Sequence, residues 1–85
     1  MKSFHLEIAA PDGMRFSGDA EQISVCSIDG SLSILAGHVP YATALAKGEC
    51  RVYADGKIKH AEVSGGFLTV TPEAVRLLSA DFTWK

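Results

Sequence analysis

The fold class of this chain is decided by residues 49–62, which read ECRVYADGKIKHAE. Apolar and polar side chains alternate on both sides of a central pair, Asp55-Gly56. Alternation with a period of two places successive side chains on opposite faces of a strand. Asp-Gly readily adopts the positive φ angles of a two-residue hairpin turn. The stretch therefore predicts a β-hairpin with strands Glu49–Ala54 and Lys57–Glu62.

The same alternation recurs along the rest of the chain. Apolar residues stand at every second position in four further runs: Phe4, Leu6, Ile8 and Ala10; Ile23 and Val25; Leu68 and Val70; Val75 and Leu77. Turn signals at Asp12-Gly13, Asp29-Gly30 and Thr71-Pro72-Glu73 separate these runs. Many short strands with frequent turns indicate an all-β fold, an antiparallel sandwich or barrel. Since Leu77 and Leu78 are both apolar, the last of these strands is expected to be covered on both faces.

Three segments depart from the simple pattern. Ser17-Gly18 is a weaker turn signal that is expected to end a short strand at Met14–Phe16. Pro40–Ala46 begins with proline, is rich in alanine and is followed by Gly48, which locally predicts a short helix. Gly65-Gly66 lacks the further glycines and the helix of a phosphate loop, so it predicts a bulge or a close approach of two backbones.

The length, net charge and apolar runs of the chain exclude several classes of function. The chain has 85 residues, enough for a single domain over residues 1–85 with one core, which excludes a catalytic cleft between two lobes. With a formal net charge of -2, the chain lacks the excess of basic residues that is typical of a nucleic-acid binder. No apolar run approaches the roughly 20 residues that span a bilayer, and the early charges of the N-terminus argue against a signal peptide. The expectation is a soluble, intracellular protein with no direct membrane insertion.

The residues that could carry chemistry are few. Two cysteines, Cys26 and Cys50, are too few for a disulfide scaffold and form no CxxC pair. His5, on the polar positions of its strand, is expected to be exposed, and His38 and His60 stand far from it without metal-ligand spacing. A zinc site built from Cys26, His38 and Cys50 remains open. There is no GxSxG elbow for a nucleophilic triad. We expect no catalytic, cofactor-binding or metal-binding residue.

The most unusual stretch is residues 28–40, IDGSLSILAGHVP, which places two turn signals around an apolar segment. It is either a strand between two ordinary loops or a pair of loops presented to a partner at one end of a sandwich. A loop that displays Ile28 beside a small polar turn resembles a docking surface more than a reaction centre.

Several blocks, in order over nearly the whole chain, carry a family resemblance. They are Leu6-Glu7-Ile8 with Pro11-Asp12-Gly13, Phe16-Ser17-Gly18, Asp29-Gly30-x-Leu32-x-Ile34-Leu35-x-Gly37-His38-x-Pro40, Thr43-Ala44-Leu45, Val63-Ser64-Gly65-Gly66-Phe67-Leu68-x-Val70 and Val75-x-Leu77-x-Ser79-Ala80. With them the chain resembles the N-terminal domain of the epsilon subunit of bacterial F-type ATP synthase, which is called delta in mitochondria.

The resemblance implies a ten-stranded antiparallel β-sandwich of two five-stranded sheets, with Pro40–Ala46 at least partly strand. It implies a noncatalytic rotor subunit of the central stalk that binds the gamma subunit and the loops of the membrane c-ring. Such a subunit helps couple proton translocation to ATP synthesis and carries no cofactor. It is a peripheral part of a hetero-oligomeric complex at the cytoplasmic face of the bacterial inner membrane.

By motif position, the resemblance also assigns two sets of contact residues. Those facing the c-ring are Ile28, Asp29, Gly30 and Ser31; those facing gamma are Ala10, His38, Val39 and Thr43.

Two departures from the family pattern qualify the resemblance. Ser33 and Ala36 stand where the family usually has glycine and proline, which predicts a less rigid loop. The chain also ends at Lys85, so we expect it to lack the two C-terminal helices with which relatives inhibit ATP hydrolysis.

Two other classes of function stay open from the residues alone. One is a stand-alone β-sandwich that binds a metal or acts as a small hydrolase through Cys26, His38, Cys50 or His60. The other is a sandwich that binds a different partner.

Overall fold

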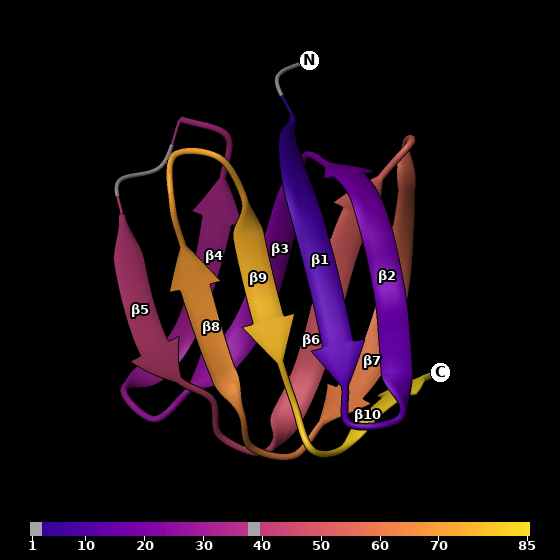
Figure 1. Cartoon of the computed structure of the whole chain (residues 1–85), viewed down its shortest axis with the longest axis vertical. Coiled ribbons are helices and arrows are strands. Elements are labelled where there is room, and N and C mark those ends of the chain that lie inside the picture. The colour runs from indigo at the N-terminus through magenta and orange to yellow at the C-terminus, as the bar shows by residue number, and fades with distance from the viewer. Residues whose placement is uncertain (1–2, 38–39) are drawn as a thin grey trace.

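The computed structural model describes residues 3–37 and 40–85. These residues form ten strands, which Figure 1 shows as two stacked layers. The strands are β1 (Phe4–Ala10), β2 (Gly13–Ala20), β3 (Gln22–Ser27), β4 (Gly30–Leu35), β5 (Tyr41–Ala44), β6 (Gly48–Ala54), β7 (Lys57–Val63), β8 (Phe67–Val70), β9 (Val75–Leu78) and β10 (Phe82–Trp84). Within the described residues, no helix is long and apolar enough to cross a membrane.

The strands divide into two five-stranded sheets. Sheet A has the order β2-β1-β9-β8-β5, and sheet B has the order β10-β7-β6-β3-β4. The prediction of an all-β sandwich with two five-stranded sheets is therefore confirmed.

One pair of strands breaks the predicted antiparallel arrangement. β1 and β9 run parallel, with Leu6 opposite Val75 and Ile8 opposite Leu77, and their arrows point the same way in Figure 1. Parallel neighbours need a long crossover connection. Here the chain between β1 and β9 supplies that connection, since it forms four of the five strands of sheet B. The prediction of a wholly antiparallel sandwich is wrong at this pair.

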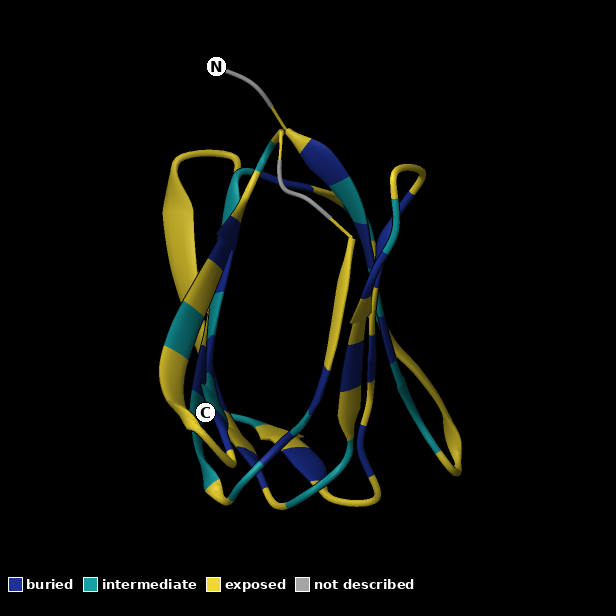
Figure 2. Cartoon of the chain, turned by 90° about the vertical axis from the view of Figure 1, so that its left-hand side faces the viewer, coloured by how far each residue is buried: buried dark blue, intermediate teal, exposed yellow. Residues whose placement is uncertain are grey.

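Alternating apolar side chains fill the space between the sheets. Buried and exposed bands alternate along several strands in Figure 2, as a period of two requires. The largest fully buried side chains are Leu6, Ile8, Ile23, Cys50, Val52, Leu68, Val70, Val75 and Leu77. Burying each of the larger aliphatic side chains contributes about 1.5–3 kcal/mol relative to leaving it in water.

The β6–β7 hairpin forms as predicted. Ala54 pairs with Lys57, so Asp55 and Gly56 make a two-residue turn, with φ angles of 52° and 71°. Positive φ at both central positions is the type I′ geometry that suits the twist of a hairpin.

The other two Asp-Gly signals mark turns that lie one residue earlier than predicted. Ala10 pairs with Gly13 and Ser27 pairs with Gly30, so the turn residues are Pro11-Asp12 and Ile28-Asp29. Each glycine instead opens the following strand.

Two local predictions are wrong because strand pairing overrides them. Ser17-Gly18 is no turn: β2 continues to Ala20, and Gly18 pairs with Leu6 of β1. The Pro40–Ala46 helix is also absent: four of its seven residues, Tyr41–Ala44, form β5, which pairs antiparallel with β8 over its whole length. A helix of so few residues is marginal in water, whereas a ladder with a neighbouring strand satisfies the same backbone groups.

Candidate interaction surfaces

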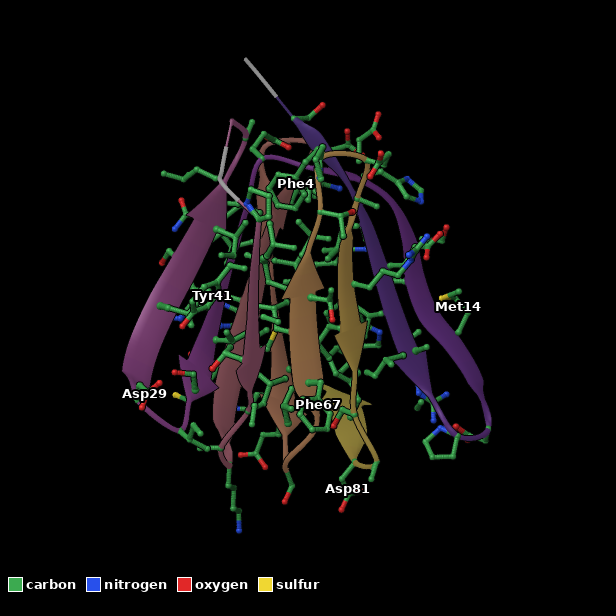
Figure 3. The ribbon with its side chains drawn as sticks, turned by 60° about the vertical axis from the view of Figure 1, so that its left-hand side comes forward. Phe4, Met14, Asp29, Tyr41, Phe67 and Asp81 are labelled. Atoms are coloured by element: carbon green, nitrogen blue, oxygen red, sulfur yellow. The ribbon has the colours of Figure 1, made fainter. Side chains whose placement is uncertain are left out.

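The β3–β4 turn stands at one end of the sandwich, where Figure 3 shows Asp29 at the same end of the molecule as Asp81. The Ser27 hydroxyl donates to the carbonyl of Gly30 at 2.8 Å and accepts from the Asp29 N–H at 3.2 Å. The Ile28 N–H donates to the carbonyl of Ala44 at 3.1 Å. These bonds tie the turn to both sheets, while the side chain of Ile28 is 67% exposed.

The four residues that the resemblance assigns to the c-ring therefore form one continuous exposed segment at this end: Ile28, Asp29, Gly30 and Ser31. The geometry suits contact with a partner, because an apolar and an acidic side chain project from a held backbone. Which partner they face remains a prediction.

The outer face of sheet A carries a second surface, which we call the apolar row. It crosses all five strands through directly paired positions, in the order Ala44, Phe67, Leu78, Ala9 and Met14. Phe67, Leu78 and Met14 are 62%, 54% and 56% exposed. Figure 3 shows the side chains of Phe67 and Met14 on the outside of the molecule. Contiguous exposed apolar residues of this kind mark interaction sites more often than isolated ones do.

A shallow hollow lies within the apolar row. It has a volume of about 370 Å³ and is lined by Ala9, Ala10, Pro11, Gly66, Phe67, Leu78, Ser79 and Ala80. Phe67 and Leu78 are directly paired across β8 and β9, so their side chains provide the largest apolar surface there. A partner side chain that fills the hollow would desolvate both, which is the arrangement of an interface anchor.

A charged group borders the apolar row on the same face. Glu7 lies one cross-strand row away and pairs with Arg76 in the ladder. Its carboxylate accepts from Arg76 Nε at 2.9 Å and lies 3.1 Å from His5 Nε2. Hydrogen bonds from Arg76 and His5 lower the pKa of Glu7 below its ordinary value. The outer face of sheet A thus combines an apolar centre with a charged border, as protein interfaces do.

The residues assigned to gamma do not all lie on this surface. Ala10 lines the hollow beside the apolar row. Thr43 is only 8% exposed, and its hydroxyl donates to the carbonyl of Ala44 at 3.3 Å. His38 and Val39 lie outside the described residues. Their assignment to gamma stays a prediction.

The structure does not bring together the three described residues of the alternative metal or hydrolytic site, Cys26, Cys50 and His60; His38 lies outside the described residues. Cys50 points into the core, and burial raises the pKa of its thiol to about 12, so it stays protonated near neutral pH. Cys26 is half-buried on the opposite, outer face of sheet B, and His60 on that face contacts Glu49 at 3.2 Å. Across the described ranges 3–37 and 40–85, no group of three His, Cys, Asp or Glu side chains could hold a metal ion.

Sequence reasoning missed Phe67 and Leu78 as surface residues. Leu78 was expected to be covered, yet it is 54% exposed because no further layer covers sheet A within the described residues. The alternation along the two strands could have indicated this. Leu68, Val70, Val75 and Leu77 all face the core, so Phe67 and Leu78, which stand at the other positions of the alternation, must face outward.

Comparison with known proteins gives a consistent result. The profile of the family "ATP synthase, Delta/Epsilon chain, beta-sandwich domain" matches residues 3–85. The ATP synthase epsilon chain of Bacillus velezensis is 42% identical over 79 residues, which cover 93% of this chain and 60% of the relative. That of Caldanaerobacter subterraneus is 38% identical over 84 residues, covering 98% of this chain and 61% of the relative.

Solved structures agree with this. A chain in the mitochondrial ATP synthase of Euglena gracilis (OSCP/F1/c-ring) superposes with a TM-score of 0.89 at 25% identity, covering 96% of this chain and 53% of that one. A chain in the central stalk/c-ring of Tetrahymena thermophila mitochondrial ATP synthase superposes with a TM-score of 0.83 at 15% identity, covering 95% and 66%; at that identity the likeness concerns the fold alone. The chain spans about 60% of the length of the curated relatives it matches.

Proposed function

This chain belongs to the ATP synthase delta/epsilon family, in its β-sandwich domain, and we propose that it serves as a noncatalytic central-stalk subunit of an F-type ATP synthase. In this role it binds the gamma subunit and the c-ring and helps couple proton translocation to ATP synthesis. Its place is peripheral, at the cytoplasmic face of the bacterial inner membrane, as one member of the complex. We propose further that residues 1–85 act as a single domain.

The observation that carries the proposal is the apolar row on the outer face of sheet A. A rotor subunit transmits torque only if it is held firmly to its neighbour, which requires a desolvated apolar contact with a polar border. Phe67, Leu78 and the hollow between β1 and β9 offer the apolar part, and Glu7 with Arg76 offers the border. Ala10, assigned to gamma by motif position, lines the same hollow.

The β3–β4 turn supports a separate contact. It lies at one end of the sandwich, so it can face a different partner from the one seated on sheet A. Its exposed Ile28 and Asp29 suit the loops of a c-ring, where a rim carboxylate steers encounter more than it adds affinity.

The gamma contact is tested by charge substitution in the row. Phe67→Glu and Leu78→Glu place a carboxylate at the hollow, so each should weaken binding to purified gamma by about tenfold or more. Ile58→Glu is the matched control: Ile58 is 52% exposed on the opposite face, in sheet B. Affinity is measured by titration calorimetry, with circular dichroism to confirm folding. Equal affinities for the native chain and both row variants would rule out this face as the gamma site.

A further inference from the structure

The outer edge of β7 is only partly covered by its neighbour β10. β7 spans Lys57–Val63, but β10 pairs only with Ala61–Val63. On this side the segment Lys57–Lys59 therefore has no partner strand among the described residues, and we call it the free edge. An unpaired edge presents N–H and C=O groups to which a further strand can bond.

The backbone of Ile58 is oriented toward this uncovered side. A two-residue turn closes on a hydrogen-bonded pair, and such pairs alternate along an antiparallel ladder. In the β6–β7 hairpin this alternation bonds Lys57 and Lys59 toward β6, so Ile58 directs its N–H and C=O away from β6. His60, the next residue of the same orientation, agrees with this, because its carbonyl accepts from the Lys85 N–H at 2.9 Å.

A hollow of about 410 Å³ lies beside the free edge and is lined by residues of both sheets. Three cationic side chains, Arg15, Lys59 and Lys85, contribute to its lining, and no described Asp or Glu does. The whole chain has ten acidic residues against eight Lys and Arg, so the lining differs in sign from the chain as a whole. The hollow therefore favours a partner group with negative charge.

The lysines of the free edge are the cations here that no described carboxylate neutralises. The other two cations of the hollow already form ion pairs, at 2.7 and 3.3 Å: Arg15 with Asp12, and Lys85 with Glu49. Within residues 3–37 and 40–85, neither Lys57 nor Lys59 forms an ion pair with a carboxylate. Both are exposed, so both remain able to pair with a carboxylate from outside the chain.

Lys59 is also held in place by aromatic rings. It stands opposite Val52, whose side chain is fully buried, so Lys59 occupies a core-facing position at the rim of the sandwich. Its Nζ lies 5.6 Å from the ring centroid of Phe16 and 5.9 Å from that of Trp84. Cation–π contacts of this kind position the ammonium group and leave its N–H groups able to donate to an anion.

We propose that the free edge of β7 binds an extended acidic segment of a partner protein, which adds a strand beside Ile58 and sets carboxylates against Lys57 and Lys59. Alternation along the added strand places its acidic side chains on the face of the two lysines and apolar ones on the face of Ile58, which is 52% exposed. The same lysines repel a second copy of this edge, so the free edge selects an acidic strand over self-pairing. This contact is separate from the apolar row and from the β3–β4 turn, so it does not depend on the partners proposed for them.

Binding is tested by an NMR titration of the whole chain, with the acetylated and amidated peptide TEVEVET as the acidic probe. Signals of the free edge and of the Trp84 indole should shift and saturate, with a Kd of about 1 mM or lower. The uncharged peptide TQVQVQT should bind about fivefold more weakly or worse. Lys59→Gln should raise the Kd for TEVEVET by about threefold or more. Lys47→Gln, an equal change of charge at an exposed position before β6 and far from the hairpin turn, should leave it unchanged.

Hydrogen exchange at Ile58 distinguishes strand addition from attraction between charges alone. An added strand bonds to the Ile58 N–H, so TEVEVET at ten times its Kd should slow exchange of that amide by about tenfold. Inorganic phosphate reaches the lysines but cannot add a strand, and it should leave this exchange unchanged. The proposal is overturned by shifts that do not saturate, by equal binding of the two peptides, or by equal effects of Lys59→Gln and Lys47→Gln. It is also overturned if Ile58 exchange does not respond to the peptide or slows equally with phosphate.

Discussion

Glu49 shows at the scale of one residue how the sheet B surface is organised. Its carboxylate accepts from Arg51 Nε at 2.8 Å and lies 3.2 Å from His60 Nδ1 and 3.3 Å from Lys85 Nζ. These three side chains come from β6, β7 and the residue after β10. The hydrogen bond from Arg51, with those from Lys85 and His60, lowers the pKa of Glu49 to about 2. One carboxylate thus connects three neighbouring chain segments.

The lowered pKa predicts an acid-sensitive contribution to stability. A carboxyl group that is more acidic in the folded state than in the unfolded state stabilises the fold fully above its unfolded pKa of about 4.5. That contribution is lost as the pH falls from there toward 2. Glu49→Gln should therefore lower the urea midpoint at pH 7, and its difference from the native chain should vanish near pH 2.

The control for the Glu49 prediction is Glu73→Gln, which removes a carboxylate from an exposed turn. The effect of Glu49→Gln should also shrink at 1 M salt, because the network is exposed to solvent and ions screen it. A native-minus-variant difference that stays constant between pH 7 and pH 2 would contradict the assignment.

At Gly66 the backbone lies very close to that of a neighbouring segment. Gly66 has a φ angle of 127°, and a Cβ atom there would collide with the carbonyl oxygen of Leu78 and lie 2.8 Å from the Cα of Ser79. Gly65 also has a positive φ, 78°, but a Cβ there would meet no atom within 4 Å. A side chain at Gly65 would therefore suffer backbone strain alone, whereas one at Gly66 would suffer both backbone strain and steric overlap.

This contrast predicts unequal effects of the same substitution. Gly65→Ala should cost about 1–2 kcal/mol, because an alanine is forced into a left-handed conformation. Gly66→Ala should cost a further 1–3 kcal/mol or so, because β8 and β9 must move apart. Urea unfolding of both variants measures the difference. Equal losses of unfolding free energy would mean that the close approach to Leu78 and Ser79 does not matter for stability.

At the scale of elements, the sequence predicted strands well where a local signal and the pairing agreed. The β6–β7 hairpin has alternation, a two-residue turn and matching strand lengths, and it forms as predicted. β5 and the second half of β2 show the opposite case. Alanine content and Ser17-Gly18 are local signals, whereas β5 is fixed by its ladder with β8 and the second half of β2 by its ladder with β1, which no local signal reports. Pairing of this kind overrides local propensity.

Of the two candidate surfaces, one could be located from the sequence and the other could not. The β3–β4 turn could be located from sequence because an Asp-Gly signal beside an apolar run marks a displayed loop. The apolar row could not, because it is assembled from five strands, and its order follows from the registers. Leu78 shows the difficulty: an apolar neighbour of Leu77 indicates a strand buried on both faces as readily as one with an exposed apolar face.

At the scale of the whole molecule, different surfaces suit different contacts. The outer face of sheet A carries the apolar row, and one end of the sandwich carries the β3–β4 turn. The four residues assigned to the c-ring span the turn and the start of β4, since Gly30 and Ser31 belong to β4. The two proposed contacts, through the turn and through the apolar row, therefore involve different residues of the chain.

The topology predicts that residues 1–85 unfold as one cooperative unit. β1 is held between β2 and β9, and the chain that joins β1 to β9 forms most of sheet B, so the two sheets are interleaved along the chain and share one core. Trp84, the only tryptophan, packs against Phe16 of sheet A and Phe82 of sheet B, and its fluorescence therefore reports on contact between the sheets. Far-ultraviolet circular dichroism reports on the strands themselves. Under urea the two signals should show coincident transitions, the mark of two-state unfolding. A fluorescence transition at lower urea than the dichroism transition would show that the sheets separate before they unfold, and would contradict a single cooperative domain.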